Sequence, residues 1–142
     1  MDHHMSKNLI EEILNCRNFA VAGASRDQSK FGYQVFYFLK KAEYMVFPVN
    51  PNSDFIDGDE VYPQLHNVPV KLDCVVTVTQ PEVTFEIVKQ AGKLQIPYVW
   101  MQPGSESLAA VNEAIAVRCQ VVSGGPCIMV EIDRRAAAHG RR

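Results

Sequence analysis

The stretch FAVAGASRDQSKFGYQV, residues 19–35, carries several groups that bind anions between an apolar run and an amphipathic one. Gly23 permits a sharp turn and a close ligand approach, and free N–H groups at the start of a following helix attract phosphate. Gly32 is expected to remove a side chain where helix and ligand would crowd each other. Hydroxyls and cations that could contact the phosphate follow Gly23 at Ser25, Arg26, Ser29 and Lys30. The pattern favours a phosphate site, but it lacks two glycines of the dinucleotide fingerprint, and an ordinary loop with solvated charges is the alternative.

A second apolar run, 44–50, ends in Asn50-Pro51, and no acidic residue follows before Asp54. In NAD-binding folds a carboxylate at this place accepts hydrogen bonds from the ribose hydroxyls. A neutral amide beside Lys30 instead tolerates a ribose that carries a phosphate, because a carboxylate would repel the added charge. The sequence therefore favours a phosphorylated ribose, with a simple Asn-Pro turn as the alternative.

The scaffold that positions these residues is predicted from an alternation of strands and helices. Short runs rich in β-branched and aromatic residues predict strands at 19–24, 44–50, 73–79, 98–102 and 120–124. Helical periodicity predicts helices at 8–15, 32–42, 81–94 and 105–118, the last with Ser105 as a candidate cap. The segment 51–72 contains three prolines and is expected to be mostly loop, with at most a short strand at 60–63.

Several of these strands are apolar on both faces, which suits a parallel sheet covered by helices on two sides. We therefore predict an α/β fold: one Rossmann-like domain with a doubly wound parallel sheet of about five strands. Residues expected to face the core from the last three helices are Val35, Phe38, Leu39, Ala42, Val83, Ile87, Val88, Ala91, Leu94, Leu108, Val111 and Ile115.

Length, composition and charge limit the number of domains and the kinds of partner that this chain is expected to have. A chain of 142 residues with 47% hydrophobic content is expected to form one domain over 1–142, with flexible ends at 1–7 and 134–142. A net charge of -2 gives no field that attracts nucleic acid or an anionic membrane. The four cysteines are widely spaced and no apolar leader precedes them, so we expect reduced thiols, a cytoplasmic protein and no metal site.

Five segments resemble, in order and spacing, the small CoA-binding proteins with a Rossmann-like fold, which are related to the CoA-binding domain of the succinyl-CoA synthetase α subunit. They are VAGASRDQSKFGYQV, FPVNPNSDFIDGDEVYPQL, DCVVTVTQPE, VWMQPGSES and CIMVE, within residues 19–131. The resemblance implies coenzyme A or an acyl-CoA as the ligand. It implies a phosphate loop at Gly23, Ala24, Ser25, Arg26, Lys30, Phe31 and Gly32, an adenosine side at Asn50 and Pro51, and a pantetheine side at Thr77, Val78, Thr79, Gln102, Pro103 and Gly104.

Two positions depart from this family pattern. Gln80 stands where many members carry an arginine, and Gly124-Gly125-Pro126 precedes Cys127 where many members carry a basic residue. Two candidate partners for phosphate or carboxylate groups are therefore missing.

No catalytic constellation is evident, since His66 and His139 have no evident base or orienting partner. Cys127 is either a small buried residue or a thiol that meets the pantetheine arm, and Trp100 either borders the cleft or belongs to the core. We expect a noncatalytic CoA-binding module acting as carrier, sensor or regulator. The alternatives are an NAD(P)-binding oxidoreductase or redox sensor, and an interaction protein whose pocket has lost its ligand. Tyr33 and Tyr37 suggest an exposed aromatic cluster for a homodimer.

Overall fold

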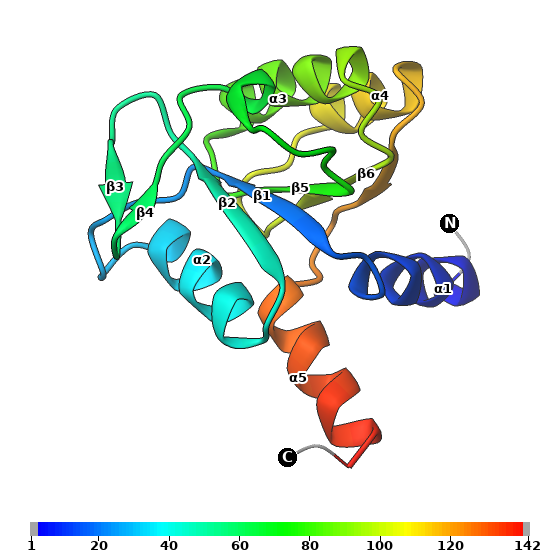
Figure 1. The fold of residues 1–142 in the computed structure, drawn as a ribbon. Helices are drawn as coiled ribbons and strands as arrows, with labels where there is room; N and C mark the ends of the chain where they lie inside the picture. Colours follow the sequence, from blue (N-terminus) through cyan, green and yellow to red (C-terminus); the bar gives the residue numbers. More distant parts are fainter. Residues whose placement is uncertain (1–2, 141–142) are drawn as a thin grey trace.

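Five parallel strands form the central sheet of the computed structural model, which describes residues 3–140 (Figure 1). The strands are β1 (Asn18–Ala22), β2 (Met45–Val49), β5 (Cys74–Thr77), β6 (Tyr98–Met101) and β7 (Gln120–Val122). They lie in the order β2-β1-β5-β6-β7, and every neighbouring pair is parallel. The predicted α/β fold with a doubly wound parallel sheet is therefore confirmed. The strand order reverses between β1 and β5, which is where open α/β sheets bind their ligands.

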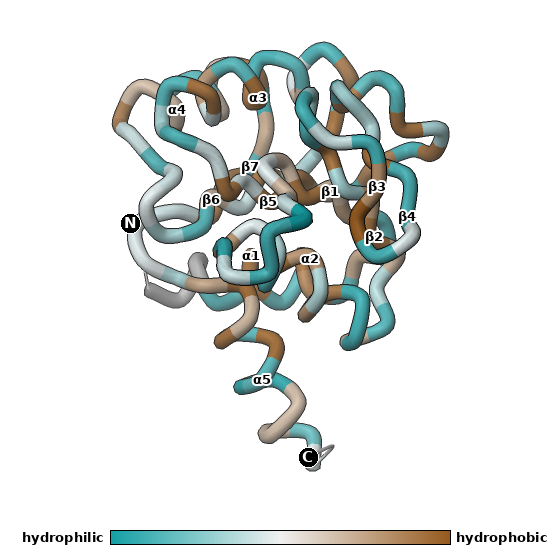
Figure 2. Tube along the Cα trace, turned by 90° about the vertical axis from the view of Figure 1, so that its left-hand side faces the viewer, coloured by the Kyte–Doolittle hydropathy of each residue, from teal (hydrophilic) through white to brown (hydrophobic). Residues whose placement is uncertain are grey.

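Helices cover both faces of the sheet (Figures 1 and 2). One face carries α1 (His3–Leu14), α2 (Phe31–Lys41) and α5 (Ile128–Ala138), and the other carries α3 (Pro81–Lys93), α4 (Leu108–Ala116) and the short 3-10 helix η1 (Leu65–Asn67). The sequence analysis did not predict α5, and residues 134–138 of the expected flexible end belong to this helix. Within α5 only Ile128 is buried, and the helix projects from the sheet (Figure 1). The outermost residues of both expected flexible ends, 1–2 and 141–142, lie outside the described residues.

The side chains of successive strand residues point to opposite faces of the sheet and pack into two separate hydrophobic cores. Phe19 and Val21 of β1 pack on the side of α1, α2 and α5, whereas Ala20 and Ala22 pack on the side of α3 and α4. Trp100 is fully buried in the first core, so the core interpretation of this residue is the correct one. In Figure 2 apolar segments lie in the strands and also in helices on either side of them, such as α3, α4 and α5. Burial on both faces explains why the strands read as almost continuous apolar runs.

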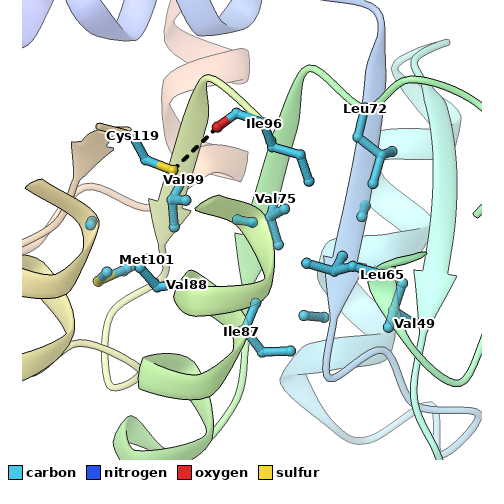
Figure 3. Packing of buried hydrophobic residues seen from close by; sticks show 14 of the residues in the cluster. Val49, Leu65, Leu72, Val75, Ile87, Val88, Ile96, Val99, Met101 and Cys119 are labelled. Carbon is cyan, nitrogen blue, oxygen red and sulfur yellow. Dashed lines mark hydrogen bonds between the residues drawn. The ribbon is translucent and has the colours of Figure 1, made fainter. Parts of the chain in front are cut away.

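The second core contains a buried thiol. Cys119 donates to the Ile96 carbonyl oxygen at 3.2 Å, beside Val99 and Met101 of β6 (Figure 3). Burial raises the pKa of the Cys119 thiol, and it raises the pKa of Cys74 well above its usual value. Both thiols therefore stay protonated and serve as small core residues.

The inward face of α4 differs from its prediction. Leu108 and Ile115 are exposed to 77% and 62%, and the buried residues are Ala110 and Ala114. The two alanines allow α4 to approach α3 closely. Gly92 of α3 lies at this contact, because a Cβ added to it would be only 2.5 Å from the Cβ of Val117, which follows α4. The sequence analysis expected Leu108, Val111 and Ile115 to face the core because periodicity alone weights large side chains, and of these only Val111 packs against it. The expectation for α3 was also partly wrong, since Val83 and Leu94 are largely exposed.

A two-stranded hairpin lies beside α2 in the segment expected to be mostly loop (Figure 1). Its strands are β3 (Phe55–Ile56) and β4 (Asp59–Glu60). The Tyr33 hydroxyl of α2 donates to Asp57 at 2.7 Å, and Lys40 pairs with Asp59. The hydrogen bond to Asp57 raises the pKa of Tyr33 to about 12. Tyr33 therefore connects the hairpin to α2. Its stacked neighbour Tyr37 is 46% exposed, and the homodimer expected at these two tyrosines stays a prediction.

Candidate functional site

The predicted site residues come from the segments that follow β1, β2, β5 and β6. Because these strands are parallel, the segments meet at the carboxyl edge of the sheet, next to the point where the strand order reverses. The structure therefore brings the three sets of predicted residues to one edge. The sets differ in how freely their side chains can reach a ligand.

Gly23 and Gly32 form the tightest contact of the site. A Cβ on Gly32 would lie 2.1 Å from the Gly23 carbonyl oxygen, and a Cβ on Gly23 would lie 2.7 Å from the Val78 carbonyl oxygen. Gly23 also has φ +92°, a value that favours glycine. The sequence analysis explained the glycine at position 32 by crowding between helix and ligand. This explanation was incomplete, because the helix already contacts the main chain of the loop at Gly23.

The loop between these glycines is held by a network centred on Asp27, which the sequence analysis missed. The Asp27 amide donates to the Ser25 hydroxyl oxygen at 3.1 Å. Asp27 Oδ1 accepts from the Ser29 amide at 3.0 Å and from the Ser29 hydroxyl at 2.7 Å. The hydrogen bonds from Ser29 hold the pKa of the Asp27 carboxyl below its usual value. The spacing of these residues, polar side chains two positions apart, is a signal for such turns that the sequence offered.

The network decides which donors of the loop are available to an anion. Ser25 uses its oxygen as an acceptor and keeps its proton to donate, whereas the Ser29 proton is already given to Asp27. Phe31 and Gly32 open α2, and within residues 3–140 their amides have no hydrogen-bond partner. The Lys30 side chain is exposed beside them, as is that of Arg26. The loop therefore offers main-chain amides, one hydroxyl and two cations to a phosphate.

Asn50 connects the ends of the first two strands. Its Nδ2 donates to the Ala24 carbonyl oxygen at 2.8 Å, and its Oδ1 accepts from the Asn52 amide at 2.8 Å. The side chain thus forms the Asn-Pro turn and also fixes the phosphate loop against β2. An aspartate here could not donate to Ala24, so loop geometry is a second reason for the neutral amide at this position.

The predicted pantetheine side divides into buried and accessible residues. Thr77 and Gln102 are fully buried, and the Thr77 hydroxyl lies 2.9 Å from that of Ser105. Ser105 is therefore part of this polar cluster, and Ser107 caps α4 in its place by accepting from the Ala110 amide. The residues left accessible at this edge are Val78, Thr79, Pro103 and Gly104.

Gln102 and Trp100 hold the turn that leads into α5. Gln102 Oε1 accepts from the Ile128 amide at 2.8 Å, and its Nε2 donates to the Cys127 sulfur at 3.3 Å. The Trp100 indole donates to the Pro126 carbonyl oxygen at 3.1 Å. Two residues of the sheet edge thereby position the glycine-rich turn, and Cys127 is half-buried where the sequence analysis favoured full burial.

Two cavities of about 520 Å³ lie outside the loop that follows β1. One of them separates α1 from α5 and is lined by Ile10, Leu14, Pro126 and Arg134 among others. A second of similar size lies by the ends of α1 and α2. Residues 26–31 of the loop after β1 are all exposed, so a ligand there would lie on the surface. Among residues 3–140 there is neither a cluster of His, Cys, Asp and Glu placed to hold a metal ion nor a helix able to span a membrane.

Comparison with known proteins now adds to this geometry. Residues 17–133 match the family model described as a CoA binding domain. The chain belongs to this family. Over 88 residues it is 31% identical to the acetate–CoA ligase [ADP-forming] II α subunit of Pyrococcus furiosus, a match that covers 60% of this chain and 19% of the relative. The chain thus spans about a fifth of that relative's length.

Solved structures show the same architecture. A hypothetical protein from Pyrococcus horikoshii superposes with a TM-score of 0.85 at 28% identity, covering 91% of this chain and 90% of the other. A conserved hypothetical protein from Pyrococcus furiosus gives a TM-score of 0.77 at 34% identity, covering 82% of this chain and 99% of the other. The Rossmann-like fold predicted for a single small domain therefore agrees with its structural neighbours.

Proposed function

We propose that this protein binds coenzyme A at the carboxyl edge of its sheet and acts as a noncatalytic module, a carrier, sensor or regulator. The diphosphate lies on the loop 23–32, the adenosine by Asn50 and Pro51, and the pantetheine arm runs past Thr79 toward Pro103 and Gly104. Membership of the CoA-binding domain family supports the choice of ligand. The similarity to a subunit of an acetate–CoA ligase also supports CoA as the ligand.

The Gly23–Gly32 contact is the observation that carries the proposal. It presses the first turn of α2 against the loop main chain, so the unpaired amides of Phe31 and Gly32 come to the place where β1 ends. An anion at a helix start gains from these amides and from the helix dipole. The adjacent hydroxyl of Ser25 and the exposed cation of Arg26 complete a site for a diphosphate, and Lys30 is left for the phosphate on the ribose.

Calorimetric titration with CoA, acetyl-CoA, NAD and NADP tests the proposal. CoA is expected to bind with one site per chain, and NAD is expected to bind far more weakly. Saturable binding of NADP without binding of CoA would instead support the dinucleotide alternative. Binding of none of the four would leave the fold without its proposed ligand and reject the function.

Lys30→Ala tests whether this lysine meets the phosphate on the ribose. An exposed charge pair contributes about 0.2–1 kcal/mol, so we expect the affinity for CoA to fall by up to about fivefold. Dephospho-CoA lacks that phosphate and should lose less than twofold, as measured by the same titration. Lys93→Ala removes an exposed cation at the end of α3 and serves as the control. Equal losses for CoA and dephospho-CoA would reject this role of Lys30.

A further inference from the structure

Asp27 is an exposed carboxylate in the middle of a loop that is otherwise suited to anions. Its neighbours Arg26 and Lys30 are cations, yet neither forms an ion pair with it among the described residues. The partners of the carboxylate are instead the amide and the hydroxyl of Ser29, both on Oδ1. Asp27 thus occupies two donors of the kind that a phosphate oxygen would use.

The contacts of Asp27 also give the loop its shape. Its amide donates to Ser25, and its carbonyl oxygen accepts from the Lys30 amide at 3.0 Å. These two contacts involve the main chain of residue 27, and they do not require a charged side chain. The carboxylate itself contributes the contacts to Ser29 and one negative charge.

We propose that the Asp27 carboxylate competes with a phosphate of CoA for the Ser29 donors and so limits the affinity of the loop. The inference rests on the proposed function, and it assigns to Asp27 the role of tuning how tightly a diphosphate is held. Two consequences of the carboxylate act in the same direction: it occupies the Ser29 amide and hydroxyl, and its charge repels the incoming phosphates. The diphosphate of CoA can overcome this competition because the rest of CoA makes further contacts along the sheet edge. Inorganic phosphate makes no such further contacts, so the Asp27 carboxylate competes with it more effectively.

Asp27→Asn separates the charge from the loop geometry. The amide oxygen of asparagine can still accept from the Ser29 amide, and asparagine forms the same type of turn as aspartate. Only the negative charge and part of the acceptor strength are lost. We therefore expect CoA to bind about three- to tenfold more tightly to this variant, the effect of removing a like charge a few ångströms from a diphosphate in water.

Titration of CoA and of inorganic phosphate into the wild-type protein, Asp27→Asn and Glu43→Gln tests the inference. Glu43 is an exposed acid at the opposite edge, between α2 and β2, so its replacement changes the net charge equally but should leave the affinity within twofold. The gain of Asp27→Asn should shrink in 1 M salt, where the screening length is about 3 Å. Thermal melts confirm that each variant is folded, and Asp27→Ser provides a second neutral replacement.

The outcomes separate this inference from the proposed function. If wild-type protein binds CoA and neither Asp27→Asn, which removes the charge, nor Asp27→Ser, which also removes the carboxylate acceptor, binds it more tightly, the competition is rejected and the function stands. A gain that is matched by Glu43→Gln, or that is unchanged in 1 M salt, also rejects it, because the effect would then be unrelated to the local charge. If neither protein binds CoA, the proposed function fails and this inference fails with it.

Discussion

Replacing Gly32 by alanine is expected to destabilise the protein by about 1–3 kcal/mol, the usual range for overpacking. Alanine normally stabilises a helix relative to glycine by up to about 1 kcal/mol, so the expected sign is the reverse of the ordinary one. The reason is the Gly23 carbonyl oxygen, which a Cβ would approach to 2.1 Å. This oxygen belongs to the main chain and cannot move without displacing the loop.

The same change should strongly reduce CoA binding, because relief of the clash moves the first turn of α2 away from the loop. Thermal unfolding and calorimetric titration measure the two effects. Gly58→Ala is the control: unlike the helical Gly32, Gly58 has a positive φ of +83°, and a Cβ there meets nothing within 4 Å. Its replacement should cost about 1–2 kcal/mol for the backbone strain alone and leave CoA binding intact. A Gly32→Ala variant as stable as the wild type, with full affinity, would contradict the structure of the site.

Gln102→Leu is expected to destabilise the protein by about 1–3 kcal/mol, because a buried donor loses its partner. Leucine keeps approximately the volume of glutamine, so the effect isolates the polar contacts. The Ile128 amide is left without its acceptor, and the start of α5 loses its connection to β6. We expect a lower unfolding temperature, together with faster hydrogen exchange at Ile128.

Gln90→Leu is the control, since it removes the same amide from a position that is partly buried. Gln90 Oε1 is buried and has no hydrogen-bond partner among residues 3–140. Replacing an unsatisfied polar group by an apolar one of similar size is expected to be neutral or stabilising. If both variants lose the same stability, the contacts of Gln102 to the turn contribute nothing specific.

The strands and the turn at Gly23 could be predicted because each depends on local sequence. β1 and β5 are short apolar runs, and the bend at Gly23 is marked by the glycine itself. The role of Gln102 could not be predicted, because its partners lie 25 and 26 residues further along the chain. The family resemblance placed Gln102 on the pantetheine side, and the structure shows that its side chain also satisfies the buried Ile128 amide.

The orientation of α4 and the existence of α5 were missed for different reasons. The buried side of α4 consists of Ala110 and Ala114, and small residues give a weak hydrophobic signal. Helix α5 buries only Ile128 fully, with Met129 and Ile132 partly buried against the same core, and its second half, Arg134–Ala138, was interpreted as part of a basic, flexible end. Asp27 differs from both, because the Ser25–Asp27–Ser29 spacing was a readable signal for local side-chain turns.

The central claim is that the loop after β1 binds the diphosphate of CoA, and amide chemical shifts measured by NMR during a CoA titration test it most directly. We predict saturable shifts that are largest for the amides of residues 24–32, with smaller ones near Asn50 and Thr79. Saturable binding that instead shifts residues lining the cavity between α1 and α5, such as Ile10 and Arg134, and leaves 24–32 unchanged would contradict the account.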